Sequence, residues 1–138
     1  MRLGDDEARR RFAPARVARL ATVDDGGRPH LVPVTFAASY DAIVTAVDAK
    51  PKRSRDLKRL RNIRANPRVA LLVDHYTDDW RALWWVRADG HARVVADAAE
   101  WAEPLRLLAD KYTQYRDGAP DGPVIEISVE RWVGWTAS

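Results

Sequence analysis

The sequence contains no cysteine, and this absence excludes several kinds of chemistry at once. Disulfides, thiolate-ligated zinc, iron–sulfur clusters and thiol catalysis all require cysteine. No apolar run approaches the roughly 18 residues that a membrane-spanning helix needs. The first residues are charged and lack the apolar region of a secretory signal peptide. We therefore expect a soluble, cytoplasmic protein.

The chain also lacks the short motifs that mark several large enzyme classes. It has no Gly-x-Ser-x-Gly nucleophile elbow, no Gly-x-x-x-x-Gly-Lys phosphate loop and no Gly-x-Gly-x-x-Gly dinucleotide turn. These absences argue against a serine hydrolase, a P-loop enzyme and a Rossmann dehydrogenase. The three histidines, His30, His75 and His91, have no spacing typical of metal ligands. We interpret each as a structural residue and expect no metal site.

Basic residues are concentrated in one short segment, although the net charge of the whole chain is only +3. Residues 50–68 contain nine basic residues and one acidic residue, a net charge of +8, and the remaining 119 residues have a net charge of −5. A basic patch on an acidic body indicates an anionic partner, although a solvated helix face is the simpler alternative. The segment has no aromatic residue on which a base could stack, which argues against single-stranded nucleic acid. A small phosphorylated cofactor explains the clustering at least as well.

The positions of the tryptophans indicate side chains that are buried by the core, by a ligand or by a partner subunit. Trp84 and Trp85 are adjacent, so on a strand they point to opposite faces, one into the core. The other could line a subunit interface, stack on a planar ligand or simply pack. Trp132 and Trp135 lie close to the C-terminus. Because exposed aromatic side chains favour association, we expect a partner subunit to cover them.

The length of 138 residues predicts a single domain over residues 1–138. The turn at residues 24–27, rich in Asp and Gly, predicts a β-hairpin, and Pro33 in its second strand predicts an edge strand. The patterns predict helices over 5–12, from Ser54 to 65, and over about 98–115, where Pro104 implies a kink or a late start. Strands are predicted over 16–23, 29–36, 43–47, 68–76, 82–96 (with a bend at Gly90 or a break) and 124–129. This order favours an antiparallel barrel with peripheral helices over a parallel α/β sheet.

The basic segment runs from a loop into the second predicted helix. A helix N-terminus presents unpaired N–H groups and a partial positive charge, which favour an anion. Lys50, Lys52 and Arg53 are expected beside this N-terminus. Within the helix, Lys58 and Arg61 are three residues apart and share a face. The residues alone therefore predict a phosphate-binding site without identifying its ligand.

Three stretches resemble one known family. Residues 22–34 resemble the first hairpin of the pyridoxamine 5′-phosphate oxidase-like split-barrel family, and residues 62–72 resemble its helix-to-strand junction ending in Asn-Pro-Arg-Val. Residues 85–90 are similar to a later strand of that family. The order of elements matches over nearly the whole chain. The resemblance implies a mainly β, antiparallel split barrel of the FMN-binding type, which forms a homodimer with cofactor sites at the interface.

The chain looks most similar to the branch of this family that uses the deazaflavin coenzyme F420. Residues 29–47 contain no Lys or Arg, whereas flavin-binding members tend to hold the phosphate partly with basic residues on this strand. The positive charge lies instead at residues 50–61, and coenzyme F420 carries a phosphate and a poly-glutamate tail. The implied activity is transfer of a hydride from reduced F420 to an unsaturated or conjugated small-molecule acceptor.

The resemblance also implies roles for individual residues. Lys58 and Arg59 match the family's basic pair on the phosphate. Charge alone adds Lys50, Lys52 and Arg53. The other residues assigned to the cofactor are Pro33, Val34 and Thr35 beside the ring, Thr45 near the phosphate and ribityl chain, and Trp85. No residue stands out as a proton donor, although Tyr76 and His75 are possible.

The sequence leaves three alternative functions open. The first is an FMN-dependent oxidase or reductase of the same fold. The second is a non-catalytic cofactor-binding or haem-binding carrier, for which His30 is a possible axial ligand. The third is a basic nucleic-acid-binding module, whose affinity would fall steeply with salt.

Overall fold

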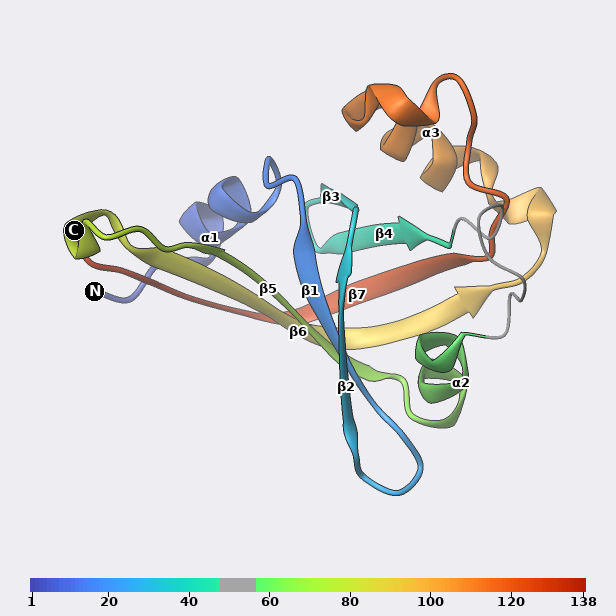
Figure 1. The fold of residues 1–138 in the computed structure, drawn as a ribbon, viewed down its shortest axis with the longest axis horizontal. Helices are drawn as coiled ribbons and strands as arrows, with labels where there is room; N and C mark the ends of the chain where they lie inside the picture. The colour runs from blue at the N-terminus through green and yellow to red at the C-terminus, as the bar shows by residue number, and fades with distance from the viewer. Residues whose placement is uncertain (48–56) are drawn as a thin grey trace.

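Residues 1–47 and 57–138 are described by the computed structural model, and they form one curled, seven-stranded antiparallel sheet (Figure 1). The strands lie in the order β2-β1-β5-β6-β7-β4-β3. Their ranges are Ala18–Val23 (β1), Pro29–Val34 (β2), Ala37–Ser39 (β3), Ala42–Ala46 (β4), Arg68–His75 (β5), Trp84–Val95 (β6) and Val124–Thr136 (β7). This half-barrel confirms the predicted mainly β, antiparallel fold class. The sequence patterns missed the short strand β3.

Helices lie at the periphery of this sheet, as predicted. They are α1 (Asp5–Phe12), α2 (Lys58–Ala65) and α3 (Ala102–Lys111). Figure 1 shows α1 near the two chain ends, with α2 and α3 toward the other end of the long strands β6 and β7. In the described part of the chain, no helix is both long enough and apolar enough to cross a membrane.

Strand β2 forms one edge of the sheet, which confirms the prediction from Pro33. Pro33 pairs with Arg19 of β1, and its missing N–H group costs no hydrogen bond on the open side. The hairpin before β2 turns at Gly27, whose φ of 82° suits glycine. The Asp24 carboxylate accepts hydrogen bonds from the amides of Gly26 and Arg28, both at 2.9 Å, and so fixes this turn.

The segment after β2 joins this edge to the opposite side of the half-barrel. The Thr45 hydroxyl on β4 donates a hydrogen bond to the carbonyl oxygen of Thr35 at 2.6 Å. The amide of Phe36 donates to the hydroxyl of Tyr112, which follows α3. Phe36 itself is fully buried in the core. The chain at residues 35 and 36 is therefore held by β4 and by the end of α3.

The longest pairing in the sheet joins β6 to β7 and contains a bulge at Gly90. A Cβ atom at Gly90 would lie 2.1 Å from the carbonyl oxygen of Ser128, so a side chain cannot be accommodated without movement. The predicted bend in one long strand is confirmed. Strand β7 continues to Thr136, seven residues beyond the predicted end at 129.

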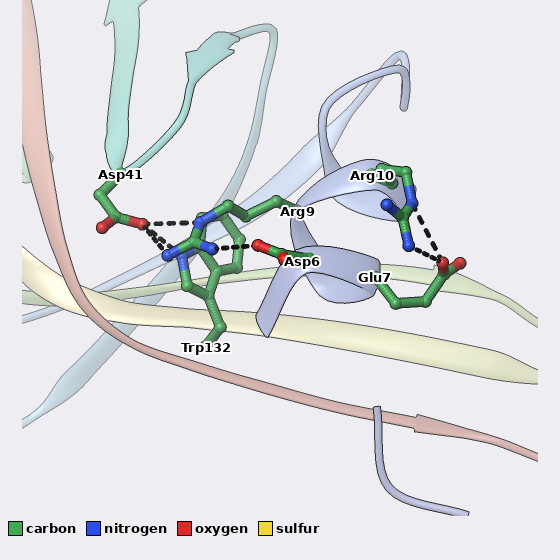
Figure 2. Close-up of polar contacts among 6 residues, drawn as sticks. All are labelled: Asp6, Glu7, Arg9, Arg10, Asp41 and Trp132. Carbon is green, nitrogen blue, oxygen red and sulfur yellow. Dashed lines mark hydrogen bonds and ion pairs between the residues drawn. The ribbon is translucent and has the colours of Figure 1, made fainter. Parts of the chain in front are cut away.

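Trp132 is buried by its own chain, with only 6% of its surface exposed. Its indole N–H donates to the Asp41 carboxylate at 2.7 Å, and Arg9 of α1 donates to the same oxygen at 2.9 Å (Figure 2). The prediction that a partner subunit covers Trp132 is therefore wrong. Trp135 remains 39% exposed.

The start of α2 differs from the sequence prediction, whereas the start of α3 agrees with it. α2 begins at Lys58, and Leu57 is the N-cap in extended conformation, so the predicted N-cap at Ser54 is wrong for this helix; Ser54 itself lies outside the described residues. α3 begins at Ala102, which puts Pro104 in the first turn, where its missing N–H group costs little. The predicted late start of this helix is confirmed.

Candidate functional site

The first turn of α2 carries the predicted phosphate-binding pair, Lys58 and Arg59. This turn has no acidic residue, and the N-cap Leu57 makes no side-chain hydrogen bond. In the described part of the chain, the Lys58 and Arg59 amides donate no backbone hydrogen bond, and together with the two cations they favour an anion. Lys50, Lys52 and Arg53 lie outside the described residues, so their contribution stays a prediction.

Lys58 is positioned by a buried carboxylate. Its ammonium lies 3.5 Å from Asp24 in the β1–β2 turn, and its side chain remains 47% exposed. The Arg28 amide is the main cause that lowers the pKa of Asp24 to about 2, against the opposing effect of burial; the Arg28 side chain and the Gly26 amide lower it further. Asp24 is thus ionised at neutral pH and directs Lys58 while leaving part of the ammonium accessible.

Among the residues that the structure describes, Arg59 has no such partner. Its side chain is partly buried, and this burial lowers the pKa of its guanidinium. No acidic side chain in residues 1–47 or 57–138 pairs with it. A guanidinium stays charged in proteins, so partial burial leaves a cation that a bound anion would stabilise.

The residues assigned to the cofactor ring differ in their accessibility. Pro33 is exposed on the edge strand, whereas Val34 is buried in the core. Thr35 is partly buried, and its hydroxyl lies 2.7 Å from that of Tyr115. Thr45 is only 1% exposed, and its hydroxyl is used to hold Thr35. The geometry brings Thr35 and Thr45 together but gives Thr45 a positioning role, with little surface for a ligand.

A pocket of about 380 Å³ opens beside Thr35. We call it the Thr35 pocket, and its lining residues are Arg16, Thr35, Tyr112, Gln114 and Tyr115. Apart from Thr35, sequence reasoning did not assign these residues to a site. Tyr112 falls within the helix predicted over about 98–115, which by itself indicates no site. The signal that could have found the pocket is the Tyr112–Tyr115 pair just after an amphipathic helix.

Lys111 lies next to this pocket and is unusually desolvated. Its ammonium donates to the carbonyl oxygen of Ala13 at 2.9 Å and lies 3.7 Å from the centre of the Phe36 ring. Burial, with a smaller contribution from Arg16, lowers the pKa of Lys111 to about 8. Among the described residues, no acidic group pairs with Lys111. This region therefore has excess positive charge.

Trp85 does not line the Thr35 pocket but lies on the outer face of the sheet. A pocket of about 560 Å³ there is lined by Arg19, Ala21, Leu31, Ala70, Leu71, Leu72, Asp74, Tyr76, Trp85 and Arg87. Leu31 is 66% exposed on this face. Trp84 packs instead against the core, so the predicted opposite orientation of the two tryptophans is confirmed. Tyr76 lines the outer-face pocket, while the His75 ring stacks on Trp84.

His30 is the one histidine with an unusual environment in the described chain. It lies on β2 opposite Thr22, and its Nδ1 atom is buried without a hydrogen-bond partner. A buried nitrogen without a hydrogen bond destabilises the fold unless a ligand or a water molecule binds to it. Within residues 1–47 and 57–138, no three acidic or histidine side chains are grouped to hold a metal ion.

The sequence of residues 5–136 matches the family described as pyridoxamine 5′-phosphate oxidase. The chain belongs to this family. The family resemblance of the hairpin and the helix-to-strand junction is thereby confirmed. Among curated proteins, no sequence matches the chain significantly.

Solved structures of similar shape support the same pyridoxamine 5′-phosphate oxidase fold. An FAD-binding protein from Mesorhizobium loti has a TM-score of 0.77 at 24% identity, over 97% of this chain and 93% of that protein. A conserved hypothetical protein from Mycobacterium tuberculosis has a TM-score of 0.79 at 21% identity, over 98% and 86%. The heme storage protein from Vibrio cholerae has a TM-score of 0.70 at 20% identity, over 93% and 89%. The shared fold thus occurs in proteins named for flavin binding and for heme storage.

Proposed function

We propose that this member of the pyridoxamine 5′-phosphate oxidase family is a coenzyme F420-dependent oxidoreductase that reduces an unsaturated or conjugated small-molecule acceptor. The observation that carries the proposal is Arg59, a partly buried cation without an acidic partner in the described chain, beside the uncapped start of α2. The phosphate and poly-glutamate tail of F420 supply several anionic groups. The basic segment has a net charge of +8, which is more than a single phosphate requires and suits a series of anionic groups.

The residues of this chain would bind and orient the cofactor, which supplies the hydride chemistry. Arg59 would bind a phosphate oxygen, and Lys58, directed by Asp24, would approach the same group. Pro33 and the backbone of residue 35 would support the ring along the edge of β2. Thr45 would hold that backbone through its hydrogen bond to Thr35. Lys50, Lys52 and Arg53 would extend the basic surface toward the tail.

A homodimer with cofactor sites at the interface is part of this proposal. The outer face exposes apolar side chains, including Leu31, Leu72 and Trp135. On the same face, Arg19 and Asp74 make no ion pair within the described residues. Two copies related by two-fold symmetry could pair these charges reciprocally and remove the apolar surface from water.

Two other cofactors are favoured by particular observations. The cations of α2 would also suit the phosphate of a flavin, and one protein of similar fold is named for FAD binding. The buried, unpartnered Nδ1 of His30 would suit an axial ligand of haem, and another similar structure is a heme storage protein. Neither accounts for the length of the basic segment.

Separate titrations of the purified protein with F420, FMN and haemin test the proposal, with fluorescence or absorbance as the signal at physiological salt. We expect micromolar affinity for F420 and much weaker binding of FMN. Tighter binding of FMN would keep the family and overturn the choice of cofactor. Tight haemin binding that is lost in His30→Ala would favour the haem alternative instead.

A further inference from the structure

The Thr35 pocket is separate from the basic start of α2 and has its own chemistry. Its volume of about 380 Å³ falls in the range typical of small-molecule sites. It is formed where the segment after β2 meets the end of α3 and the loop before β1. Arg16 and Tyr115 therefore line the same cavity, although they are 99 positions apart in the sequence.

The hydroxyl groups in the pocket offer a hydrogen-bond donor. The Tyr112 hydroxyl has no hydrogen left for a ligand, because it donates to the Arg16 carbonyl while it accepts from the Phe36 amide. The Thr35 and Tyr115 hydroxyls lie 2.7 Å apart, and only one of their two hydrogens can lie between them. The other hydrogen is available to a ligand. The Gln114 amide can donate further hydrogen bonds at the rim.

The charge in and around the pocket is positive. The Arg16 guanidinium donates only long hydrogen bonds to the Lys111 carbonyl, at 3.3 and 3.4 Å, and lies 5.0 Å from the centre of the Tyr112 ring. No lining residue is acidic, and no carboxylate in the described chain pairs with Arg16 or Lys111. The pocket thus has donors and cations without a matching anion, which favours a ligand with a carboxylate.

The pocket walls favour a flat ligand. The Tyr112 and Tyr115 rings meet edge to face, with their centres 5.6 Å apart. Because Tyr112 is buried and Arg16 lies over its ring, the partly exposed Tyr115 ring is the surface against which a planar, conjugated molecule can pack. We propose that the Thr35 pocket binds a small planar carboxylate, with Arg16 on the carboxylate and the Thr35–Tyr115 pair donating a hydrogen bond to it.

The chemistry of the pocket also indicates the class of acceptor, an assignment that rests on the proposed function. The acceptor would be an α,β-unsaturated carboxylate bound beside Thr35, next to the expected ring position. Its reduction adds a hydride from the reduced cofactor to the β carbon and a proton from solvent to the α carbon. The carbon–carbon double bond would become single, and the cofactor would be left in its oxidised form.

The test uses trans-cinnamate as the probe and cinnamamide as its neutral analogue, with binding to the wild-type chain measured by calorimetry before any cofactor is added. We expect cinnamate to bind at least about tenfold more tightly than cinnamamide. Arg16→Gln should remove this preference, and Arg16→Lys should restore part of it. Tyr115→Phe should weaken cinnamate binding. Arg131→Gln, at an exposed position of β7 outside the lining of the pocket, is the matched control and should leave binding unchanged.

Equal affinity for cinnamate and cinnamamide, no binding at millimolar probe, or an unchanged affinity in a folded Arg16→Gln variant would each overturn the proposal. Thermal melting of each variant checks that it folds. Failure here is distinguishable from failure of the proposed function. If F420 does not bind but cinnamate binds through Arg16, the pocket stands and the cofactor assignment falls. If F420 binds but cinnamate does not, the cofactor assignment stands and the pocket proposal falls.

Discussion

The ammonium of Lys58 lies 3.5 Å from the buried carboxylate of Asp24. This contact joins the β1–β2 turn to the first turn of α2, two segments that are 34 residues apart. The same carboxylate accepts hydrogen bonds from two backbone amides of its own turn. One acidic residue therefore fixes the hairpin and directs a candidate phosphate-binding cation.

Asp24 should make stability depend on acid pH. Because its pKa is lowered from 3.8 to about 2 in the folded state, its ionised form stabilises the fold above about pH 4. That contribution is lost as the pH falls through 4 toward 2. Urea unfolding across this range should show the loss in the wild type and a flatter profile in Asp24→Asn. The exposed neighbour variant Asp25→Asn should keep the wild-type profile, and equal profiles for all three would contradict this role.

Lys111 should produce a dependence at alkaline pH. Its pKa is lowered from 10.5 to about 8, so between these values the unfolded chain binds more protons than the folded one. Stability should therefore rise from pH 8 toward pH 10.5. Lys111→Met removes the titrating group and should flatten this rise in urea unfolding. A Met variant with the wild-type slope would show that another group is responsible.

Trp132 should contribute to stability through its indole N–H as well as its packing. Its hydrogen bond is the main cause that lowers the pKa of Asp41, and Arg9 adds to the effect. Trp132→Phe keeps an aromatic ring but leaves the carboxylate with one donor fewer. We expect a loss of about 1.5 kcal/mol, or a Tm lower by about 5 °C. Trp80→Phe, at a 69% exposed site, should change the Tm little; an equal decrease would argue against the Asp41 contact.

The outer face should control the oligomeric state. Leu72→Arg places a charge among the exposed apolar side chains beside the outer-face pocket, and it should convert a homodimer to a monomer because the charge would be buried at the interface. Val17→Lys is a control at a site of similar exposure, 38% against 37%. Sedimentation or light scattering measures the mass. A monomeric wild type would contradict the proposed homodimer.

The sequence was sufficient for much of the sheet. Pro33 identified an edge strand because proline cannot donate to a neighbour, and Gly90 identified the bend because a glycine inside a strand pattern is typical of a bulge. These features follow from the chemistry of single residues. Three stretches of sequence, read together, also identified the family.

The features that were missed depend on contacts between distant segments. Trp132 donates a hydrogen bond to Asp41, 91 positions away, and its ring packs on Phe12 of α1, and no local pattern reveals these contacts. The Thr35 pocket likewise combines residues from three separate segments. Ser54 is a favourable N-cap type, but the extended backbone at Leu57 delays the helix to Lys58. Local preference could not anticipate these tertiary effects.

The central claim is that Arg59 binds the phosphate of F420. The most direct measurement compares F420 affinity in wild type, Arg59→Gln and Arg64→Gln, at two salt concentrations. Arg64 is an exposed cation at the other end of the same helix, so its variant makes the same change in net charge. The account predicts roughly 10- to 100-fold weaker binding in Arg59→Gln, as expected for a charge-assisted hydrogen bond, and near wild-type affinity in Arg64→Gln. Equal affinity in Arg59→Gln and wild type, or equal losses in both variants, would contradict it.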